Sequence, residues 1–520
     1  MEHSAWSILP PLIAIILALW TKEVYMSLII AIFSGALLYT GFNPLESILT
    51  MFAVMEEKVG SNVNILVFLV ILGILVAAIS KSGATRAYGE WAAKSISGKR
   101  STLFLTALLG IVIFIDDYFN CLTVGTVMRP ITDKFKISRA KLAYVIDTTA
   151  APICIIAPVS SWAAAVSSSL PENSSIDGFE LFIQTIPFNL YAILAMIFMV
   201  FIIFTGRDFS AMGDTVVKNR ENFIIPKEYR DEAEAEYQHS NKVDVDYKLT
   251  DETENNLRKC SVMDLFLPIL VLIIACVYGM LYTGGIHEGS SVTNAFANCD
   301  ASKALVLGSF IAFIFTGLLY MIRRILSFKA FCECFSNGFK AMVPAIFILC
   351  LAWTLSGICN DKYLDLGGFV GTLVSEHTSI VMFLPPVFFV VSLGMAFATG
   401  TSWGTFGILI PIAVATMGTD TANTSLLVLC VAAILSGAVS GDHASPISDT
   451  TILASAGAQC HHIEHVRTQF PYVMVVSACS LIGYLVDGVT LNGWMGLAAG
   501  FICLLAVMFF IKSKVQVKEI

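Results

Sequence analysis

Ser440-Gly-Asp-His-Ala-Ser-Pro-Ile-Ser-Asp-Thr-Thr451 lies within a long and otherwise apolar run at 425–456. The stretch holds two acids, a histidine and several hydroxyls, while the residues on either side are apolar enough to lie in a bilayer. An acid at the centre of a membrane helix costs about 2.5–3.5 kcal/mol on insertion scales, so acids at that depth normally mark a functional site. Because proline also interrupts the run, it predicts a broken membrane span with a polar site at the break.

The composition of the whole chain agrees with a membrane protein. Of its 520 residues, 56% are apolar and 13% are charged, whereas about a quarter of the residues in soluble domains are charged. The mean hydropathy is +0.78. This composition excludes a soluble enzyme, and the net charge of -8 argues against nucleic acid as a partner. The 13 cysteines are mostly scattered singly in apolar segments, and we interpret them as packing residues.

Apolar stretches of the length that a membrane helix needs recur along the chain. They lie at 5–21, 24–42, 62–80, 183–205, 262–283, 303–322, 341–358, 470–487 and 493–511. Further apolar stretches are interrupted by polar residues, glycine and proline, at 102–132, 142–170, 379–416 and 425–456. The sequence therefore predicts many membrane spans, several of them broken.

Lysine and arginine in short loops predict the orientation of these spans. Basic residues between 81 and 100, and again between 129 and 141, place both loops in the cytoplasm, so 102–132 is a hairpin entered from the cytoplasm. The loops 359–378 and 417–424 are poor in lysine and arginine, so 379–416 is a hairpin entered from outside. The protein is then a multi-pass protein of the cell inner (plasma) membrane, with its N-terminus outside and its C-terminus in the cytoplasm.

The two halves of the chain therefore repeat one pattern in opposite orientation, which is a common plan of secondary transporters. The predicted fold is an all-α polytopic membrane protein of two inverted repeats, each with five transmembrane helices plus a re-entrant hairpin, and an extra C-terminal helix. The predicted units are the N-terminal repeat at 1–205, a cytoplasmic acidic linker at 206–261, the C-terminal repeat at 262–490, and the extra transmembrane helix with a cytoplasmic tail at 491–520.

The interrupted stretches carry five acids with hardly any basic residue beside them, so protons or cations must neutralise the cluster. We expect a cation or substrate site made by the acids and by the hydroxyl, amide and glycine residues that accompany them: Asp116, Asp117, Asn120, Thr123, Asp147, Thr148, Ser160, Gly400, Thr401, Ser402, Thr405, Asp442, His443, Ser445, Ser448, Asp449 and Thr450. Hard oxygen ligands suit a small cation, and sodium is expected to bind through a subset, with Asp117, Asn120, Asp442 and Asp449 favoured.

Simpler interpretations exist for the same residues. Asp116 and Asp117 also suit the cap of a helix at a water-filled turn. Asp147 also suits a structural helix that is kinked by its prolines. The glycine- and hydroxyl-rich turn of the outer hairpin also suits a plain tight turn. His443 either carries the exchanged proton or is a hydrogen-bonded structural residue.

Four motifs resemble those of the NhaC-type sodium/proton antiporter family, within the ion-transporter superfamily. They are Ile115-Asp-Asp-Tyr-Phe-Asn120, Asp147-Thr-Thr-Ala-Ala-Pro152, Gly400-Thr-Ser-Trp-Gly-Thr405 and Gly441-Asp-His-Ala-Ser-Pro-Ile-Ser-Asp-Thr450. The resemblance implies exchange of sodium for protons, in some members together with an organic solute such as a carboxylate or an amino acid. It also implies an elevator-type carrier, whose moving domain of hairpins and broken helices slides against a scaffold that often forms a homodimer.

Antiport, in which sodium and protons compete for the acids, is the leading hypothesis. The hydroxyl-rich turns would equally hold an amino acid or carboxylate beside sodium, which would make the protein a sodium-coupled carrier without plain sodium/proton exchange. Two aspartates are also what an intramembrane protease needs, but the inverted repeat argues against a protease. Broken helices also suit alternating access better than a channel.

We expect no enzyme activity and no prosthetic group. The expected partners are sodium, protons, the lipid bilayer and, in the alternative, a small organic anion or amino acid.

Overall fold

The computed structural model describes residues 5–21, 23–96, 98–167, 177–221, 260–291, 299–360, 362–366, 382–417 and 424–514, together with residues 295 and 369. The regular elements within these ranges are helices. Most of the predicted acidic linker, most of the predicted outer loops 359–378 and 417–424, and the end of the predicted cytoplasmic tail lie outside the described residues.

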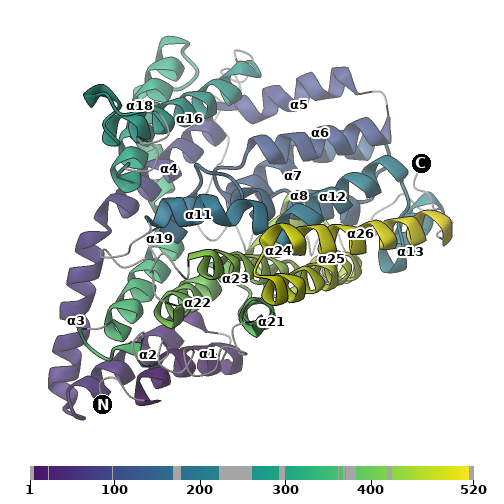
Figure 1. Cartoon of the computed structure of the whole chain (residues 1–520). Helices are drawn as coiled ribbons and strands as arrows, with labels where there is room; N and C mark the ends of the chain where they lie inside the picture. The colour runs from purple at the N-terminus through teal and green to yellow at the C-terminus, as the bar shows by residue number, and fades with distance from the viewer. Residues whose placement is uncertain are drawn as a thin grey trace.

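The N-terminal half of the chain forms a succession of helices, of which the first ones run along one edge of the molecule (Figure 1). They are α1 (Leu9–Thr21), α2 (Val24–Tyr39), α3 (Pro44–Ser61), α4 (Val63–Ser82), α5 (Ala84–Ser95), α6 (Lys99–Val112), α7 (Asp117–Lys134), α8 (Arg139–Thr148), α9 (Ala151–Cys154), α10 (Ser161–Ser167), α11 (Gly178–Thr185), α12 (Leu190–Thr205) and α13 (Ser210–Glu221).

The C-terminal half adds a second set of helices. They are α16 (Met263–Thr283), α18 (Ala301–Ile322), α19 (Phe328–Cys359), α21 (Leu384–Thr399), α22 (Ser402–Met417), α23 (Thr424–Ala444), α24 (Asp449–Ala458), α25 (His462–Thr490) and α26 (Gly493–Lys514). The two sets are interleaved in space, because α24 and α25 pack against α8, and α25 also packs against α12 (Figure 1).

Among the described residues, six helices are long and apolar enough to cross a membrane: α4, α16, α18, α23, α25 and most of α26. The number rises to nine if each of three bent helix pairs is one span. Large apolar side chains such as Ile502 and Phe509 on α26 are 65% and 74% exposed, as expected where lipid takes the place of water. The chain is therefore a multi-pass membrane protein.

Each interrupted stretch of the sequence is divided into separate helices at a break. The breaks lie at 113–116 between α6 and α7, at 149–160 around the one-turn helix α9, at 400–401 between α21 and α22, and at 445–448 between α23 and α24. Local chemistry explains them. Asp116 and Ser448 cap the helices that follow, because their side chains accept from backbone N–H groups of the first turn. Gly400 ends α21 with a φ of 70°, which glycine adopts without a steric cost.

Several helices differ from the sequence expectation. The helix α3 lies between the predicted spans 24–42 and 62–80, α5 occupies a segment that was expected to be a loop, and α13 lies inside the segment expected to be a linker. All three are too rich in polar residues for a search by apolar content to find them. The helices α19 and α25 start at 328 and 462, before the spans expected at 341 and 470, for the same reason.

Glycines let helices of the two halves approach each other at their backbones. A Cβ atom on Gly457 of α24 would lie 2.6 Å from the carbonyl oxygen of Cys121 on α7, and one on Gly125 of α7 would lie 2.6 Å from the Cα of Gly457. A second contact joins α4 to α19, where a Cβ on Gly338 would lie 2.6 Å from the carbonyl oxygen of Gly73. Small residues at such crossings are typical of membrane helices, since close packing holds them together.

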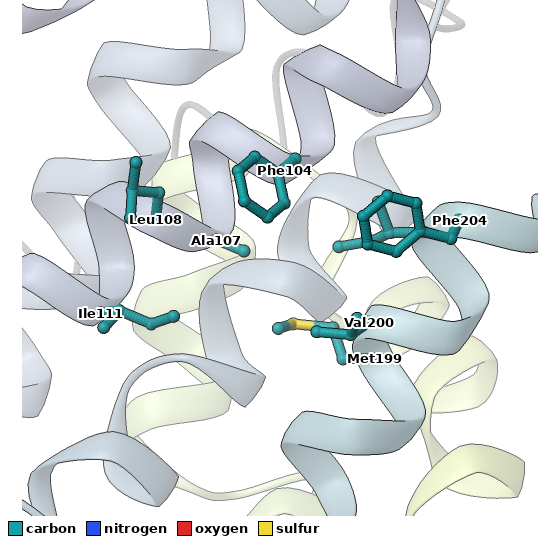
Figure 2. Close-up of a pocket in the computed structure, with 8 residues that line it drawn as sticks. Phe104, Ala107, Leu108, Ile111, Met199, Val200 and Phe204 are labelled. Carbon is teal, nitrogen blue, oxygen red and sulfur yellow. The ribbon is translucent and has the colours of Figure 1, made fainter.

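A groove of about 330 Å³ lies between α6 and α12. Figure 2 shows apolar side chains of α6 on one side and of α12 on the other: Phe104, Ala107, Leu108 and Ile111 opposite Met199, Val200 and Phe204. This lining offers no oxygen ligand to a cation. The polar residues singled out in the sequence lie elsewhere.

Candidate functional site

The four breaks meet in the structure. The Asp449 N–H donates to the carbonyl oxygen of Gly400 at 3.3 Å, which joins the two breaks of the C-terminal half. The Ser161 N–H donates to the carbonyl oxygen of Ile115 at 3.2 Å, which joins the two breaks of the N-terminal half. The Tyr118 hydroxyl donates to Asp449 Oδ2 at 3.4 Å and so links one half to the other. Segments that are hundreds of residues apart therefore form one polar centre.

Asp116 and Asp117 stand at the start of α7 and are 3% and 1% exposed. Asp116 caps the helix, since its Oδ1 accepts the Phe119 N–H at 2.9 Å. Asp117 Oδ2 accepts from the indole Nε1 of Trp162 at 3.3 Å. The first acid thus has the capping role that the simpler interpretation gave to both, whereas the second faces a buried tryptophan on α10.

Asn120 ties together the ends of two other helices. Its side-chain Nδ2 lies 2.6 Å from the carbonyl oxygen of Gly110, 3.0 Å from that of Ile113 and 2.9 Å from that of Thr149. These acceptors fix the orientation of the amide, because only the NH₂ group can donate. The Oδ1 atom is consequently buried without a hydrogen-bond partner, so it remains available to a ligand.

Asp442 and Asp449 lie on either side of the break between α23 and α24. Asp442 is 2% exposed, and its Oδ2 accepts from the Thr450 hydroxyl at 3.0 Å, while its Oδ1 is buried without a partner. Asp449 is exposed and contacts Tyr118. One carboxylate is thus buried and the other exposed, and Asp442 interacts electrostatically with Asp117, Asp147 and Asp449.

Asp147 on α8 is fully buried and lies at the centre of a separate group of polar side chains. Its Oδ2 accepts from Gln469 Nε2 at 2.5 Å and from the Thr451 hydroxyl at 3.1 Å. His465 Nε2 lies 3.4 Å from the same oxygen, and His443 Nε2 lies 3.7 Å from Oδ1. Within the part of the chain that the structure describes, no lysine or arginine pairs with any of the five acids.

His443 is held in one place by two hydrogen bonds. Its Nε2 lies 2.9 Å from the carbonyl oxygen of Asp147, and its Nδ1 lies 3.0 Å from the Tyr191 hydroxyl. A carbonyl oxygen only accepts, so Nε2 carries a hydrogen, and Nδ1 can accept from the tyrosine. A neutral imidazole therefore satisfies both contacts.

Most of the hydroxyls in the predicted set bind backbone groups. The Ser160 hydroxyl donates to Cys154 and accepts from the Ala163 N–H, which begins α10. The other contacts of this kind are Ser445 with Phe397, Ser402 with Ala438, Thr405 with Thr401, Thr401 with the Gly404 N–H, and Ser448 with the Thr451 N–H. These hydrogen bonds stabilise the backbone at and near the breaks. Thr123 and Thr148 are buried as well.

Outside the group around Asp147, four buried atoms in these segments have no hydrogen-bond partner: Asn120 Oδ1, Ser161 Oγ, Asp442 Oδ1 and Trp403 Nε1. A buried polar atom without a partner costs about 1–3 kcal/mol, so such atoms normally face water or a ligand. Three of the four are oxygens, which suits a small hard cation. Trp403 packs against Trp162, with ring centroids 5.7 Å apart, and Trp162 is the residue that donates to Asp117.

Three residues of the group around Asp147 are absent from the predicted site: His465, Gln469 and Thr451. His465 lies between the stretches 425–456 and 470–487 that the sequence predicts to be spans, yet it is fully buried because α25 already begins at His462. Gln469 is also fully buried. Residues four positions apart lie on one face of a helix, so their spacing could have indicated a polar face on α25. Thr451 was quoted in the polar stretch but was not placed in the site.

Similarity to known proteins agrees with this picture. A profile of the Na+/H+ antiporter family matches residues 164–489. An uncharacterised protein of Haemophilus influenzae is 40% identical, over 99% of this chain and 96% of its own length. A malate-2H(+)/Na(+)-lactate antiporter of Bacillus subtilis is 31% identical over 37% of this chain and 40% of its own length. An arginine/ornithine antiporter of Halobacterium salinarum is 35% identical over 29% of this chain and 30% of its own length.

The family match covers more than half of the chain and includes the two C-terminal breaks with Asp442 and Asp449. Its named relatives are antiporters, which are transporters and not enzymes. The chain belongs to the Na+/H+ antiporter family.

Proposed function

We propose that this protein exchanges sodium for protons across the cell inner membrane, with the sodium ion bound at the meeting point of the four breaks. The observation that carries the proposal is the group of buried carboxylates that, among the described residues, pair with no lysine or arginine, beside oxygens that have no hydrogen-bond partner. Asp117, Asn120 Oδ1 and Asp442 would hold the ion, and the exposed Asp449 would attract it. The proposed exchange needs no prosthetic group.

The second candidate is a sodium-coupled carrier of an amino acid or a carboxylate, without plain sodium/proton exchange. The names of two relatives favour it, since one exchanges malate and lactate and the other exchanges arginine and ornithine. The unpartnered Ser161 Oγ and Trp403 Nε1 would then bind polar groups of the solute. The acidic surroundings favour a solute that carries an amino group.

We also propose that the halves 1–205 and 262–490 are inverted repeats and that transport follows an elevator mechanism in a homodimer, with the N-terminus outside and the C-terminus in the cytoplasm. The packing of α4 against α19 supports the repeat, because each is the third predicted span of its half. The gathering of the four breaks into one polar centre supports a domain that carries the ion.

The test is sodium-driven pH change in proteoliposomes, measured alone and with a panel of amino acids and carboxylates. Wild type should move protons in response to sodium without solute, and Asp442→Asn should abolish the flux. Asp487→Asn is the matched control, since Asp487 is a fully buried acid at the far end of α25, beside Gly496, and it should leave the flux unchanged. Flux that requires one solute would establish the second candidate and name its substrate.

A further inference from the structure

His465 is a fully buried histidine whose ring nitrogens both lack a hydrogen-bond partner. Its Nε2 faces Asp147 Oδ2 at 3.4 Å. A buried imidazole with two unused nitrogens beside a carboxylate is costly when neutral, and a proton on the ring would form an ion pair with the acid.

His443 differs from His465 although it is near the same carboxylate. The hydrogen bonds of its two nitrogens are satisfied by the neutral ring, as described above. His443 thus contacts Asp147 and Tyr191 through both ring nitrogens, whereas neither ring nitrogen of His465 has a hydrogen-bond partner.

The helices that pack against α25 carry other titratable groups. They are Lys141 and Tyr144 on α8, Tyr191 on α12, Asp214 on α13, Asp442 and His443 on α23, and Asp449 and Cys460 at the two ends of α24. Lys141 is paired with Asp208. Among the described residues, Asp147 is the carboxylate within ion-pair distance of His465.

We propose that His465, paired with Asp147, binds the exchanged proton, at a place separate from the acids that hold sodium. The proposal rests on the proposed sodium/proton exchange and assigns its proton. A proton from water on one side binds a ring nitrogen of His465, and the pair changes from a charge of minus one to neutral. The proton leaves to water on the other side when the pair loses it again.

The break between α23 and α24 connects this pair to the sodium site. Thr451 donates to Asp147 Oδ2, and the neighbouring Thr450 donates to Asp442 Oδ2. Neutralising the His465–Asp147 pair removes one negative charge from the surroundings of Asp442, which weakens the attraction for sodium. Proton binding and sodium binding thereby oppose each other without sharing a ligand.

The experiment compares wild type, His465→Gln and His462→Gln in proteoliposomes. His462 is the matched control because it is also buried on α25 and hydrogen-bonds to Pro446 and Ser455. Sodium/sodium exchange, which needs no proton, should persist in all three. In wild type and in His462→Gln, sodium affinity should fall as the pH drops, by up to about tenfold per pH unit for one linked proton. In His465→Gln that dependence and the sodium-driven pH change should be lost.

An unchanged pH dependence in His465→Gln would overturn this proposal and leave sodium/proton exchange intact. Absence of sodium-driven pH change in wild type would instead overturn the proposed function, and this proposal with it. A measurement on wild type covers the case in which His465→Gln does not fold. Infrared difference spectra with ring-labelled histidine should lose an imidazolium band when sodium is added, and spectra without such a change would contradict the proton site.

Discussion

At the scale of single residues, Asn120 combines a structural role and a binding role in one side chain. Its NH₂ group satisfies carbonyl oxygens at the ends of α6 and α8, while its Oδ1 remains without a partner. Helix ends leave carbonyl groups that need such donors, above all where lipid excludes water. The same amide that stabilises two breaks therefore presents an oxygen to the candidate cation site.

This double role predicts that Asn120→Asp destabilises the protein and does not create a better cation ligand. A carboxylate would face the carbonyl oxygens of Gly110, Ile113 and Thr149 without a donor, and each buried group left unsatisfied costs about 1–3 kcal/mol. The midpoint of thermal unfolding in detergent should fall. Thr126→Ala serves as the control, since it removes only a hydroxyl bonded within α7. A stable Asn120→Asp variant with tighter sodium binding would contradict this account.

At the scale of elements, the crossing of α7 and α24 brings the two halves of the site together. The contact depends on Gly125 and Gly457, which let the helix backbones touch. Neither glycine has an unusual φ, so close approach and not backbone conformation requires them. The spacing between Asp117 on one helix and Asp449 on the other depends on this contact.

Gly457→Ala should therefore separate α7 from α24 and reduce both thermal stability and sodium flux. The added Cβ would lie 2.6 Å from the carbonyl oxygen of Cys121, a backbone atom that cannot move aside alone. Gly394→Ala on α21 is the matched control, because a Cβ there meets nothing within 4 Å. The control should be neutral or stabilising by about 0.5–1 kcal/mol, since alanine favours helix over glycine. Equal effects of the two substitutions would argue against a backbone contact.

A buried ion pair joins α8 to the segment that follows α12. Lys141 and Asp208 are 1% and 0% exposed, and Asp208 Oδ1 also accepts from the Tyr472 hydroxyl on α25 at 2.8 Å. The ring of Phe209 stacks on Tyr472 with centroids 4.5 Å apart. Three elements are thus held together at the start of the predicted linker.

Removing one partner of this ion pair should lower the stability of the protein more than replacing both partners by apolar residues. Asp208→Ala leaves the Lys141 charge buried, and loss of one partner of such a pair costs about 3–5 kcal/mol. The double variant Lys141→Met with Asp208→Leu replaces the pair by apolar volume and should be more stable than Asp208→Ala. Thermal unfolding followed by size-exclusion chromatography provides the comparison. A double variant that is less stable than the single one would contradict the argument.

At the scale of the whole molecule, the proposed orientation has consequences on both sides of the membrane. The C-terminus is proposed to be cytoplasmic, so a fluorescent protein fused there should fold and fluoresce. The loop at 284–290 between α16 and α18 is proposed to lie outside, so alkaline phosphatase inserted there should be active. The same two reporters exchanged between the sites are the control. Activity of both exchanged fusions would reverse the orientation.

The composition and the four interrupted stretches were enough to predict a multi-pass helical membrane protein, and the resemblance of four motifs indicated the family to which it belongs. Acids, prolines and glycines inside apolar runs are rare because they are energetically costly there, so their presence indicates broken helices and a polar site from the sequence alone. The positions of the breaks near Asp116, Gly400 and Ser448 follow from capping and turn chemistry that acts over a few residues.

Only the tertiary structure decided which of these polar residues contact one another. The backbone uses the hydroxyls of Ser160 and Ser445, whereas Asn120 Oδ1 and Asp442 Oδ1 are left without partners. The tertiary structure also buries His465 against Asp147, which is 318 positions away in the numbering of the chain. Local patterns determine where helices start and stop, but contacts between distant segments depend on how the helices pack, and the spacing of residues along one chain does not contain that information.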